Sequence, residues 1–219
     1  IRRERRLIPL RRNASRAGLR LVEARSARHW GRLLGQHEGV SDTDAILFSS
    51  GTAANESVIG ALSRVATGPH YTHPYWYFEN TQSIQKSFVE AVDHCELASV
   101  AFLNLEPVTY HNLGRDSAVI EPLDVVRRFV AKGKGNPEKR FFVVLDLTQD
   151  PLACLKNLLS DPLPPNLTVV KTVSVTKHQR GARNYFFGAA FVINDAAIEG
   201  GTLTDLVREE RDLQGGTLL

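Results

Sequence analysis

The sequence predicts an α/β domain of three layers, in which helices cover both faces of a mostly parallel sheet. Two observations support this prediction. Strand-like and helix-like segments alternate along the chain, and the strand-like segments are almost uninterrupted apolar runs, as in strands that are covered on both faces. Phe141 to Leu147, FFVVLDL, is the clearest run, with Asp146 as its only charged residue. Ligands of such folds bind beyond the carboxyl ends of the strands, so a site is expected there.

The length and composition are those of an ordinary soluble domain. The chain has 219 residues, of which 42% are hydrophobic and 23% are charged. No run approaches the roughly 20 apolar residues of a membrane span, and no signal-peptide pattern occurs, so we expect a cytoplasmic protein. Cys95 and Cys154 form no CxxC motif and are interpreted as small buried hydrophobes, while His70 and His73 lack a third ligand. We therefore expect neither a disulfide framework nor a metal site.

The N-terminal stretch is strongly basic, although the formal net charge is only +3. Eight arginines lie in the first twenty residues: Arg2, Arg3, Arg5, Arg6, Arg11, Arg12, Arg16 and Arg20. Such a run can bind phosphates, including those of nucleic acid. It has no interleaved aromatic residues and matches no nucleic-acid module, so we favour a solvated or partner-facing arm.

Apolar residues recur at helical spacing from Ala14 to Leu34, which predicts an amphipathic helix after the arm. We therefore divide the chain into a basic arm with its helix, residues 1–35, and an α/β domain, residues 36–219. Because the chain begins with Ile1 and contains no methionine, we expect the sequence to be incomplete: either it is a fragment of a longer protein or some residues are not represented in it.

A candidate anion site follows the first predicted strand, Ala45 to Phe48. The next segment, Ser49 to Leu62, has a small-residue turn that opens an amphipathic helix. Free backbone N–H groups and the positive end of the helix dipole face the same way there, which favours a phosphate bound at Ser50, Gly51 and Thr52. The alternative is structural: a serine caps the helix and the glycine permits a tight turn.

The segment His70 to Thr81 is rich in aromatic residues, namely Tyr71, Tyr75, Trp76, Tyr77 and Phe78. One ring could stack on a flat ligand, and buried packing is the alternative for each of them. Further along the chain, we expect helices over Thr81–Val92, Glu121–Ala131 and Leu203–Leu213, strands over Leu97–Leu105 and Phe186–Asp195, and a surface loop over Lys132–Arg140.

Two charged residues lie at the ends of predicted buried strands. Asp146 is costly there unless a partner compensates it, so we expect a buried cation beside it, with a helix cap as the alternative. Leu167 to Val175 predicts another strand, and it leads to Lys177, which Ser174 and Thr176 flank with hydroxyl groups. A lysine in a dry pocket can form a Schiff base with a carbonyl cofactor, whereas a solvated strand end is the alternative.

Three strand ends thus supply a phosphate cup, a buried acid and a lysine, and an aromatic cluster accompanies them. Pyridoxal phosphate needs this set: an anion cup for its phosphate, an amine for its aldehyde, a carboxylate that keeps its ring nitrogen protonated, and a flat surface against its ring. The combination therefore predicts pyridoxal phosphate as the cofactor.

The motifs ILFSSGTAAN, VVLDLTQDP and VSVTKHQRG, the last followed by the strand FFGAAFV, occur in this order and cover the chain from about Arg16 onward. They resemble the fold-type I pyridoxal phosphate enzymes, closest to the cystathionine synthase and lyase group of Cys/Met metabolism. The resemblance implies the large domain of that fold. It also implies a stacking ring at Tyr77, with Tyr75 second. The remaining implied roles are phosphate binding by Ser50, Gly51, Thr52, Ser174 and Thr176, contact with the pyridine nitrogen by Asp146, and the covalent link by Lys177.

The resemblance implies a lyase or transferase that acts on an amino acid, by β- or γ-elimination or replacement at the side chain. Lys177 would act first as the Schiff base and then move the α-proton. Aminotransfer, aldolase-type cleavage and decarboxylation use the same cofactor residues and stay open. The family also implies a homo-oligomer, a dimer or tetramer, in which Arg16 contacts a neighbour's phosphate. The family's C-terminal small domain, which carries the arginine for the substrate carboxylate, lies outside this chain, so no substrate clamp is assigned. A non-catalytic relative that binds a partner through the arginine-rich arm is the second hypothesis.

Overall fold

The computed structural model describes residues 45–74, 76, 78–104, 120–148, 162–174, 188–195, 197–198 and 201–215. The predicted helix over Ala14–Leu34 lies outside these residues, as do Cys154 and three of the predicted site residues: Tyr77, Thr176 and Lys177.

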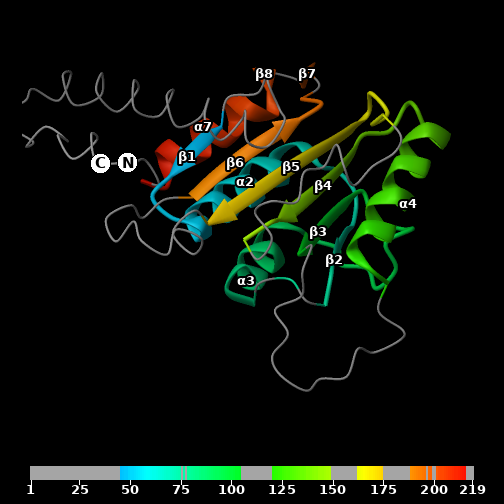
Figure 1. Cartoon of the computed structure of the whole chain (residues 1–219), viewed down its shortest axis with the longest axis horizontal. Helices are drawn as coiled ribbons and strands as arrows, with labels where there is room; N and C mark the ends of the chain where they lie inside the picture. The colour runs from blue at the N-terminus through cyan, green and yellow to red at the C-terminus, as the bar shows by residue number, and fades with distance from the viewer. Residues whose placement is uncertain are drawn as a thin grey trace, which may run out of the picture.

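The centre of the fold is a six-stranded sheet with the order β1-β6-β5-β4-β3-β2 (Figure 1). Its strands are β1 (Ile46–Phe48), β2 (His70–Thr72), β3 (Val100–Asn104), β4 (Phe141–Asp146), β5 (Leu167–Ser174) and β6 (Gly188–Ile193). The pairs from β2 to β5 are parallel, whereas β6 pairs antiparallel with both β5 and β1. Only β6 is therefore reversed, and the carboxyl ends of the other strands meet at one edge.

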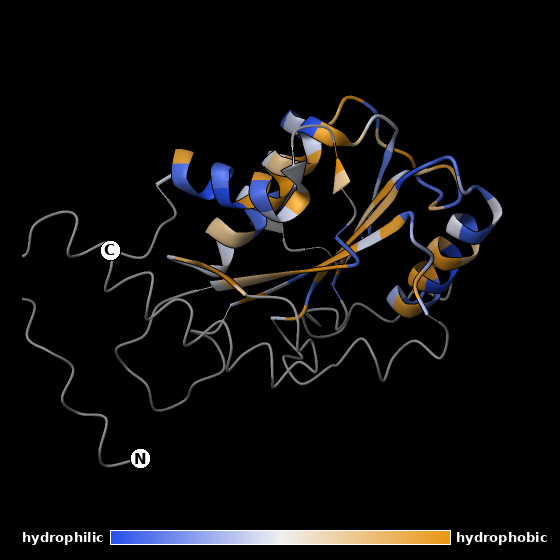
Figure 2. Cartoon of the chain, turned by 90° about the horizontal axis from the view of Figure 1, so that it is seen from above, coloured by the Kyte–Doolittle hydropathy of each residue, from blue (hydrophilic) through white to orange (hydrophobic). Residues whose placement is uncertain are grey.

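Helices cover both faces of this sheet, which confirms the predicted three-layer fold. Alternate strand residues such as Phe102, Val144 and Val170 form one apolar core with α2 (Gly51–Val65), α3 (Phe78–Ser87) and α7 (Leu203–Leu213). The intervening residues, such as Leu103 and Leu145, form a second core with α4 (Pro122–Gly135). Figure 2 shows the strands coloured hydrophobic over most of their length between these layers. Because both faces are buried, the strands need apolar residues at successive positions.

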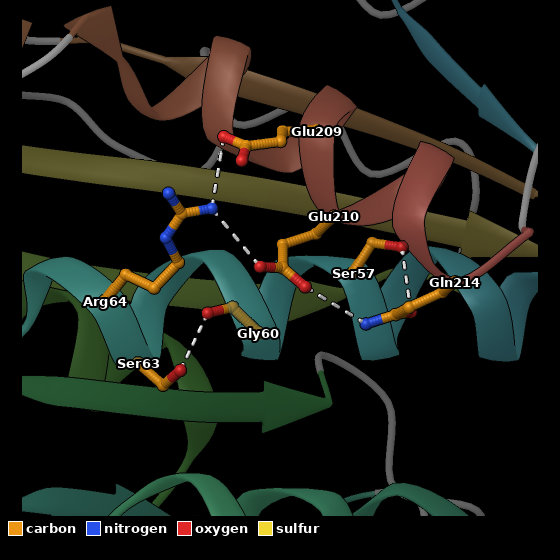
Figure 3. A network of polar contacts seen from close by, with 7 residues as sticks. All are labelled: Ser57, Gly60, Ser63, Arg64, Glu209, Glu210 and Gln214. Carbon is orange, nitrogen blue, oxygen red and sulfur yellow. Dashed lines mark hydrogen bonds and ion pairs between the residues drawn. The ribbon is translucent and has the colours of Figure 1, made fainter.

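A polar network joins α7 to the outer side of α2 (Figure 3). The Arg64 guanidinium contacts the carboxylates of Glu209 at 3.1 Å and Glu210 at 3.3 Å. The Ser57 hydroxyl donates to Gln214 Oε1 at 3.3 Å. The helices approach closely at Gly60, where an added Cβ would lie 2.9 Å from Glu210 Oε2. These contacts hold α7 beside the C-terminal half of α2.

Several bounds differ from those predicted. The three-residue β2 falls in the aromatic segment, where no strand was predicted, and α3 begins at Phe78 and ends at Ser87 rather than spanning Thr81–Val92. The α4 helix continues to Gly135, through the first part of the predicted loop. The reason lies in Lys132, whose Nζ lies 5.2 Å and 5.1 Å from the ring centroids of Phe129 and Phe141. This lysine packs on aromatic rings, so its turn of helix is stabilised instead of solvated.

Two smaller features complete the fold. A short hairpin, β7 (Ala197–Ile198) with β8 (Gly201–Thr202), leads into α7. Among the described residues, no helix is both long and apolar enough to cross a membrane. Cys95 is buried, as its interpretation as a small hydrophobe predicted.

Candidate functional site

The carboxyl edge of the sheet gathers polar residues on the face that α2 covers. Asn104, Asp146 and Thr172 are register partners on the adjacent parallel strands β3, β4 and β5. Register partners in parallel strands project to the same face, so these three side chains lie in a row. Two residues further along β5, Ser174 pairs with Gly188, the first residue of β6. The four polar side chains, Asn104, Asp146, Thr172 and Ser174, are buried, where polar groups need partners.

The N-terminus of α2 begins beside this row. The Ser50 hydroxyl accepts a hydrogen bond from the Ala53 N–H at 3.0 Å, and the Ser50 carbonyl accepts one from the Ala54 N–H at 3.1 Å. Ser50 is therefore the helix cap that the structural alternative predicted. Within the described part of the chain, the N–H groups of Gly51 and Thr52 make no hydrogen bond. The cap and an anion site use different atoms, so both are compatible with this helix end.

Two glycines let the α2 N-terminus approach the strand ends. A Cβ added to Gly51 would lie 2.6 Å from the Ser174 Cβ. A Cβ added to Gly188 would lie 2.6 Å from the Ser50 carbonyl carbon and 2.7 Å from the Gly51 nitrogen. Any larger residue at either position would push helix and strands apart. Gly188 was not singled out in the sequence, although a glycine at the start of a strand is a recognised signal of close backbone approach.

The carboxylate of Asp146 is 6% exposed and receives two N–H donors. Its Oδ1 accepts from the Thr148 backbone N–H at 2.8 Å, and its Oδ2 accepts from Asn55 Nδ2 at 3.1 Å. Among the described residues these hydrogen bonds are its compensation and it forms no ion pair, so the expected cation beside Asp146 stays a prediction. The Thr148 hydroxyl in turn accepts the Ser174 N–H at 3.1 Å, which links the ends of β4 and β5.

Asn55 and Asn80 are buried polar residues that the sequence analysis missed. They lie on α2 and α3, and Asn55 Nδ2 donates to Asn80 Oδ1 at 3.3 Å. Three polar atoms near Asp146 have no hydrogen-bond partner among the described residues: Asn55 Oδ1, Asn80 Nδ2 and Thr172 Oγ1. A buried polar atom without a partner costs about 1–3 kcal/mol. A polar ligand or an ordered water beside the carboxylate would satisfy such atoms, so the residues present fit a polar group bound at this edge.

The aromatic segment divides into packed rings and rings outside the described residues. Tyr71 and Trp76 are buried, and Trp76 packs edge-on against Phe102 with ring centroids 5.6 Å apart. Packing, the alternative to ligand stacking, therefore holds for these two rings. Tyr75 and Tyr77 lie outside the described residues, and so does the Phe78 side chain.

The two histidines of this segment are structural. His70 packs on Phe88 with ring centroids 5.3 Å apart, and His73 Nε2 lies 2.9 Å from the Ile120 carbonyl oxygen. Burial lowers the pKa of both imidazoles, although the contact with Ile120 works in the opposite direction for His73. The lowered pKa of each imidazole favours its neutral form. The described residues contain no cluster of three or more His, Cys, Asp or Glu side chains that could hold a metal ion.

The structure thus brings Ser50, Gly51, Asp146 and Ser174 to one edge, with Thr52 in the first turn of α2. Lys177 follows Ser174 by three residues in the sequence and lies outside the described residues, together with Thr176 and Tyr77. The described part of the predicted site is therefore one contiguous patch.

The sequence matches no protein-family model, and no curated protein is significantly similar to it. Solved structures do match. A methionine gamma lyase from Micromonospora echinospora superposes with a TM-score of 0.56 at 20% identity, covering 87% of this chain and 49% of that one. An Escherichia coli protein with a methionine aminotransferase function superposes with a TM-score of 0.54 at 17% identity, covering 88% of this chain and 52% of that one. The L-threonine-O-3-phosphate decarboxylase of Porphyromonas gingivalis superposes with a TM-score of 0.51 at 13% identity, covering 87% of this chain and 56% of that one.

At these identities the likeness concerns the fold, and the chain has the fold of the large domain of fold-type I pyridoxal phosphate enzymes. It spans about half the length of the solved structures that it matches. The three matched structures carry names of three different reactions, so the fold alone is compatible with each.

Proposed function

We propose that this chain is the cofactor-binding domain of a pyridoxal phosphate enzyme that acts on an amino acid. The observation that carries the proposal is the placement of Asp146: a buried carboxylate with donors on both oxygens, at the same sheet edge as a capped helix N-terminus. A buried carboxylate and a phosphate-binding helix end are two of the contacts that this cofactor needs.

Each predicted site residue that the structure describes has a role in this proposal. The N–H groups of Gly51 and Thr52, which make no hydrogen bond among the described residues, would bind the phosphate, and the hydroxyls of Ser50 and Ser174 would add to this site. Asp146 accepts a hydrogen bond from the protonated ring nitrogen. When bound, pyridoxal phosphate supplies an aldehyde and an electron-withdrawing ring that stabilises negative charge at the substrate α-carbon.

The remaining residues are assigned from the sequence. Lys177 would hold the aldehyde through its amine and would move the α-proton of the substrate, Thr176 would add a hydroxyl to the phosphate site, and Tyr77 would stack on the ring. The covalent role requires an amine that is neutral when it attacks, which partial burial of a lysine favours.

The reaction that we propose is β- or γ-elimination or replacement at the substrate side chain. It rests on the resemblance of the Ser-Gly-Thr, Asp and S-x-T-K motifs to the Cys/Met group, in accord with a likeness to a structure named as a methionine gamma lyase. We also propose a cytoplasmic homo-oligomer. Aminotransfer and decarboxylation are the alternatives, because two other similar structures are named for them.

A labelling experiment tests the proposal. The chain is incubated with pyridoxal phosphate, reduced with borohydride, digested and mapped. We expect one phosphopyridoxyl group on Lys177, and none at that position in the Lys177→Ala variant. Lys86 is an exposed lysine at the end of α3, so Lys86→Ala is the matched control and should leave the label on Lys177 unchanged. Label that spreads over exposed lysines, with Lys177 unmodified, would contradict the proposal.

A further inference from the structure

Asn55 stands out among the buried polar residues because its single amide nitrogen serves two partners. It lies on α2 and is 4% exposed. Asn55 Nδ2 donates one hydrogen to Asp146 Oδ2 at 3.1 Å and the other to Asn80 Oδ1 at 3.3 Å. Both hydrogens of the amide are therefore used, and neither partner can be lost without leaving a buried donor unsatisfied.

The pattern of donors determines the orientation of the carboxylate. The Thr148 backbone N–H can only donate, so Asp146 Oδ1 must accept. Asn55 supplies the second donor to Oδ2, from a helix on the other side of the carboxylate. Two donors on different elements hold the plane of the carboxylate, while each oxygen keeps a further lone pair for a ligand.

Asn80 is the second acceptor of the Asn55 amide, whose orientation the Asp146 carboxylate already requires because an ionised carboxylate only accepts. Asn80 is fully buried in the first turn of α3 and presents its carbonyl oxygen to the Asn55 amide nitrogen. With the opposite amide orientation, Asn55 would direct its oxygen at both Asp146 and Asn80, which are acceptors here. Tyr77 directly precedes α3 in the sequence. The helix that follows the proposed stacking residue is therefore tied to the carboxylate through Asn55.

We propose that Asn55 is a positioning residue that orients Asp146 toward the ring nitrogen of the bound cofactor, and that Asn80 supports Asn55 by accepting the second hydrogen of its amide. This inference rests on the proposed function. It adds two residues on α2 and α3 that would not contact the cofactor ring nitrogen themselves but act through Asp146.

A double-mutant cycle tests whether Asn55 acts through Asp146. The dissociation constant for pyridoxal phosphate is measured by absorbance titration for wild type, Asn55→Leu, Asp146→Ala and the double variant. We expect Asn55→Leu to weaken binding by about 10- to 100-fold, the factor typical of a hydrogen bond to a charged group. In the Asp146→Ala background the same substitution should change binding by less than about twofold, because the residue it acts through is gone.

Three further variants separate positioning from packing. Asn55→Asp keeps the shape of the side chain but replaces the donor with an acceptor, so it should weaken binding at least as much as Asn55→Leu. Asn80→Leu should have a smaller effect in the same direction, and both should shift the absorption maximum of the bound cofactor. Ser57→Ala is the control: it removes a partly buried hydrogen bond from α2, but to Gln214, the residue that follows α7. It should lower stability without changing affinity or spectrum.

The outcomes distinguish the two proposals. If wild type does not bind pyridoxal phosphate, the proposed function fails and this inference fails with it. If wild type binds and Asn55→Leu is equally harmful with and without Asp146, only the positioning role is overturned. A full-affinity Asn55→Asp variant would overturn it as well, and so would a loss of affinity in Ser57→Ala equal to that in Asn55→Leu.

Discussion

The two faces of the sheet differ at the same strand ends. On the α2 face the last residues of β3, β4 and β5 are polar, ending in Asn104, Asp146 and Ser174. On the α4 face the neighbouring positions of these strands are Leu103, Leu145 and Val173. Both sets are buried, so hydrophobic burial alone does not explain the first set. Both faces carry an apolar core, but only the α2 face ends in buried polar groups, which is why the proposed site is placed there.

Lys171 is the exception on the α4 face. It is 1% exposed and is paired in register with Leu145 and Phe191. Together with Asp146 it is one of two charged residues in the described strands, and it too has an interaction partner. Lys171 was not predicted as a site residue because it lies inside its strand, whereas Asp146 lies at the strand end where ligands of this fold bind.

The largest expected loss of stability comes from a large-to-small substitution in the apolar core between the sheet and α4. Phe129 is fully buried and packs edge-on against Phe141 with ring centroids 6.2 Å apart. Phe129→Ala should lower the free energy of unfolding by about 3–5 kcal/mol, because it removes a large apolar side chain and leaves a cavity. Urea unfolding measures this. Cofactor affinity of the folded fraction should stay unchanged, and a parallel loss of affinity would break the separation between the two faces.

Adding one methyl group at the carboxyl edge should have an intermediate effect. In Gly188→Ala the new Cβ would lie 2.6 Å from the Ser50 carbonyl carbon, so α2 and β6 must move apart. We expect a loss of about 1–3 kcal/mol in unfolding free energy, as for other overpacked sites, together with weaker cofactor binding.

Gly135→Ala is the matched control for that variant. An added Cβ at Gly135, the last residue of α4, meets no atom within 4 Å. It should therefore leave affinity unchanged and stabilise the chain by about 0.4–1 kcal/mol through the unfolded state. Equal changes in unfolding free energy and in cofactor affinity for the two glycine variants would show that binding and stability do not depend on the close approach at Gly188.

The smallest effect compares two helix caps. Ser50 caps α2 with an Oγ to Ala53 N distance of 3.0 Å, and Thr202 caps α7 with an Oγ1 to Asp205 N distance of 3.2 Å. Alanine at either position should cost about 1 kcal/mol of stability, seen as a lower midpoint of thermal unfolding. Only Ser50→Ala should also raise the dissociation constant for pyridoxal phosphate. Equal affinity in both variants would restrict Ser50 to the structural role.

Much of the fold was predictable because its signals are local. The apolar run at Phe141 predicted β4 to within one residue, and the small-residue turn before α2 predicted its start. The strand His70–Thr72 was not predicted because three residues are too few to show a periodic pattern. The extension of α4 was not predicted because Lys132 was interpreted as a solvated loop residue. In the site, Asp146 was noticed because a charge in an apolar run is conspicuous. Asn55 was not, since a polar residue in an amphipathic helix is unremarkable in the sequence.

The sequence by itself determined where strands and helices form and which residue types end the strands. These properties depend on side chains a few positions apart, within one element. Tertiary structure decided that Asn55 reaches Asp146 across 91 positions and that Gly188 lies against Ser50. Such contacts depend on strand order and on the reversal of β6, which no single segment encodes. The buried carboxylate was therefore visible in the sequence, but the amides that orient it became visible only once the sheet was assembled.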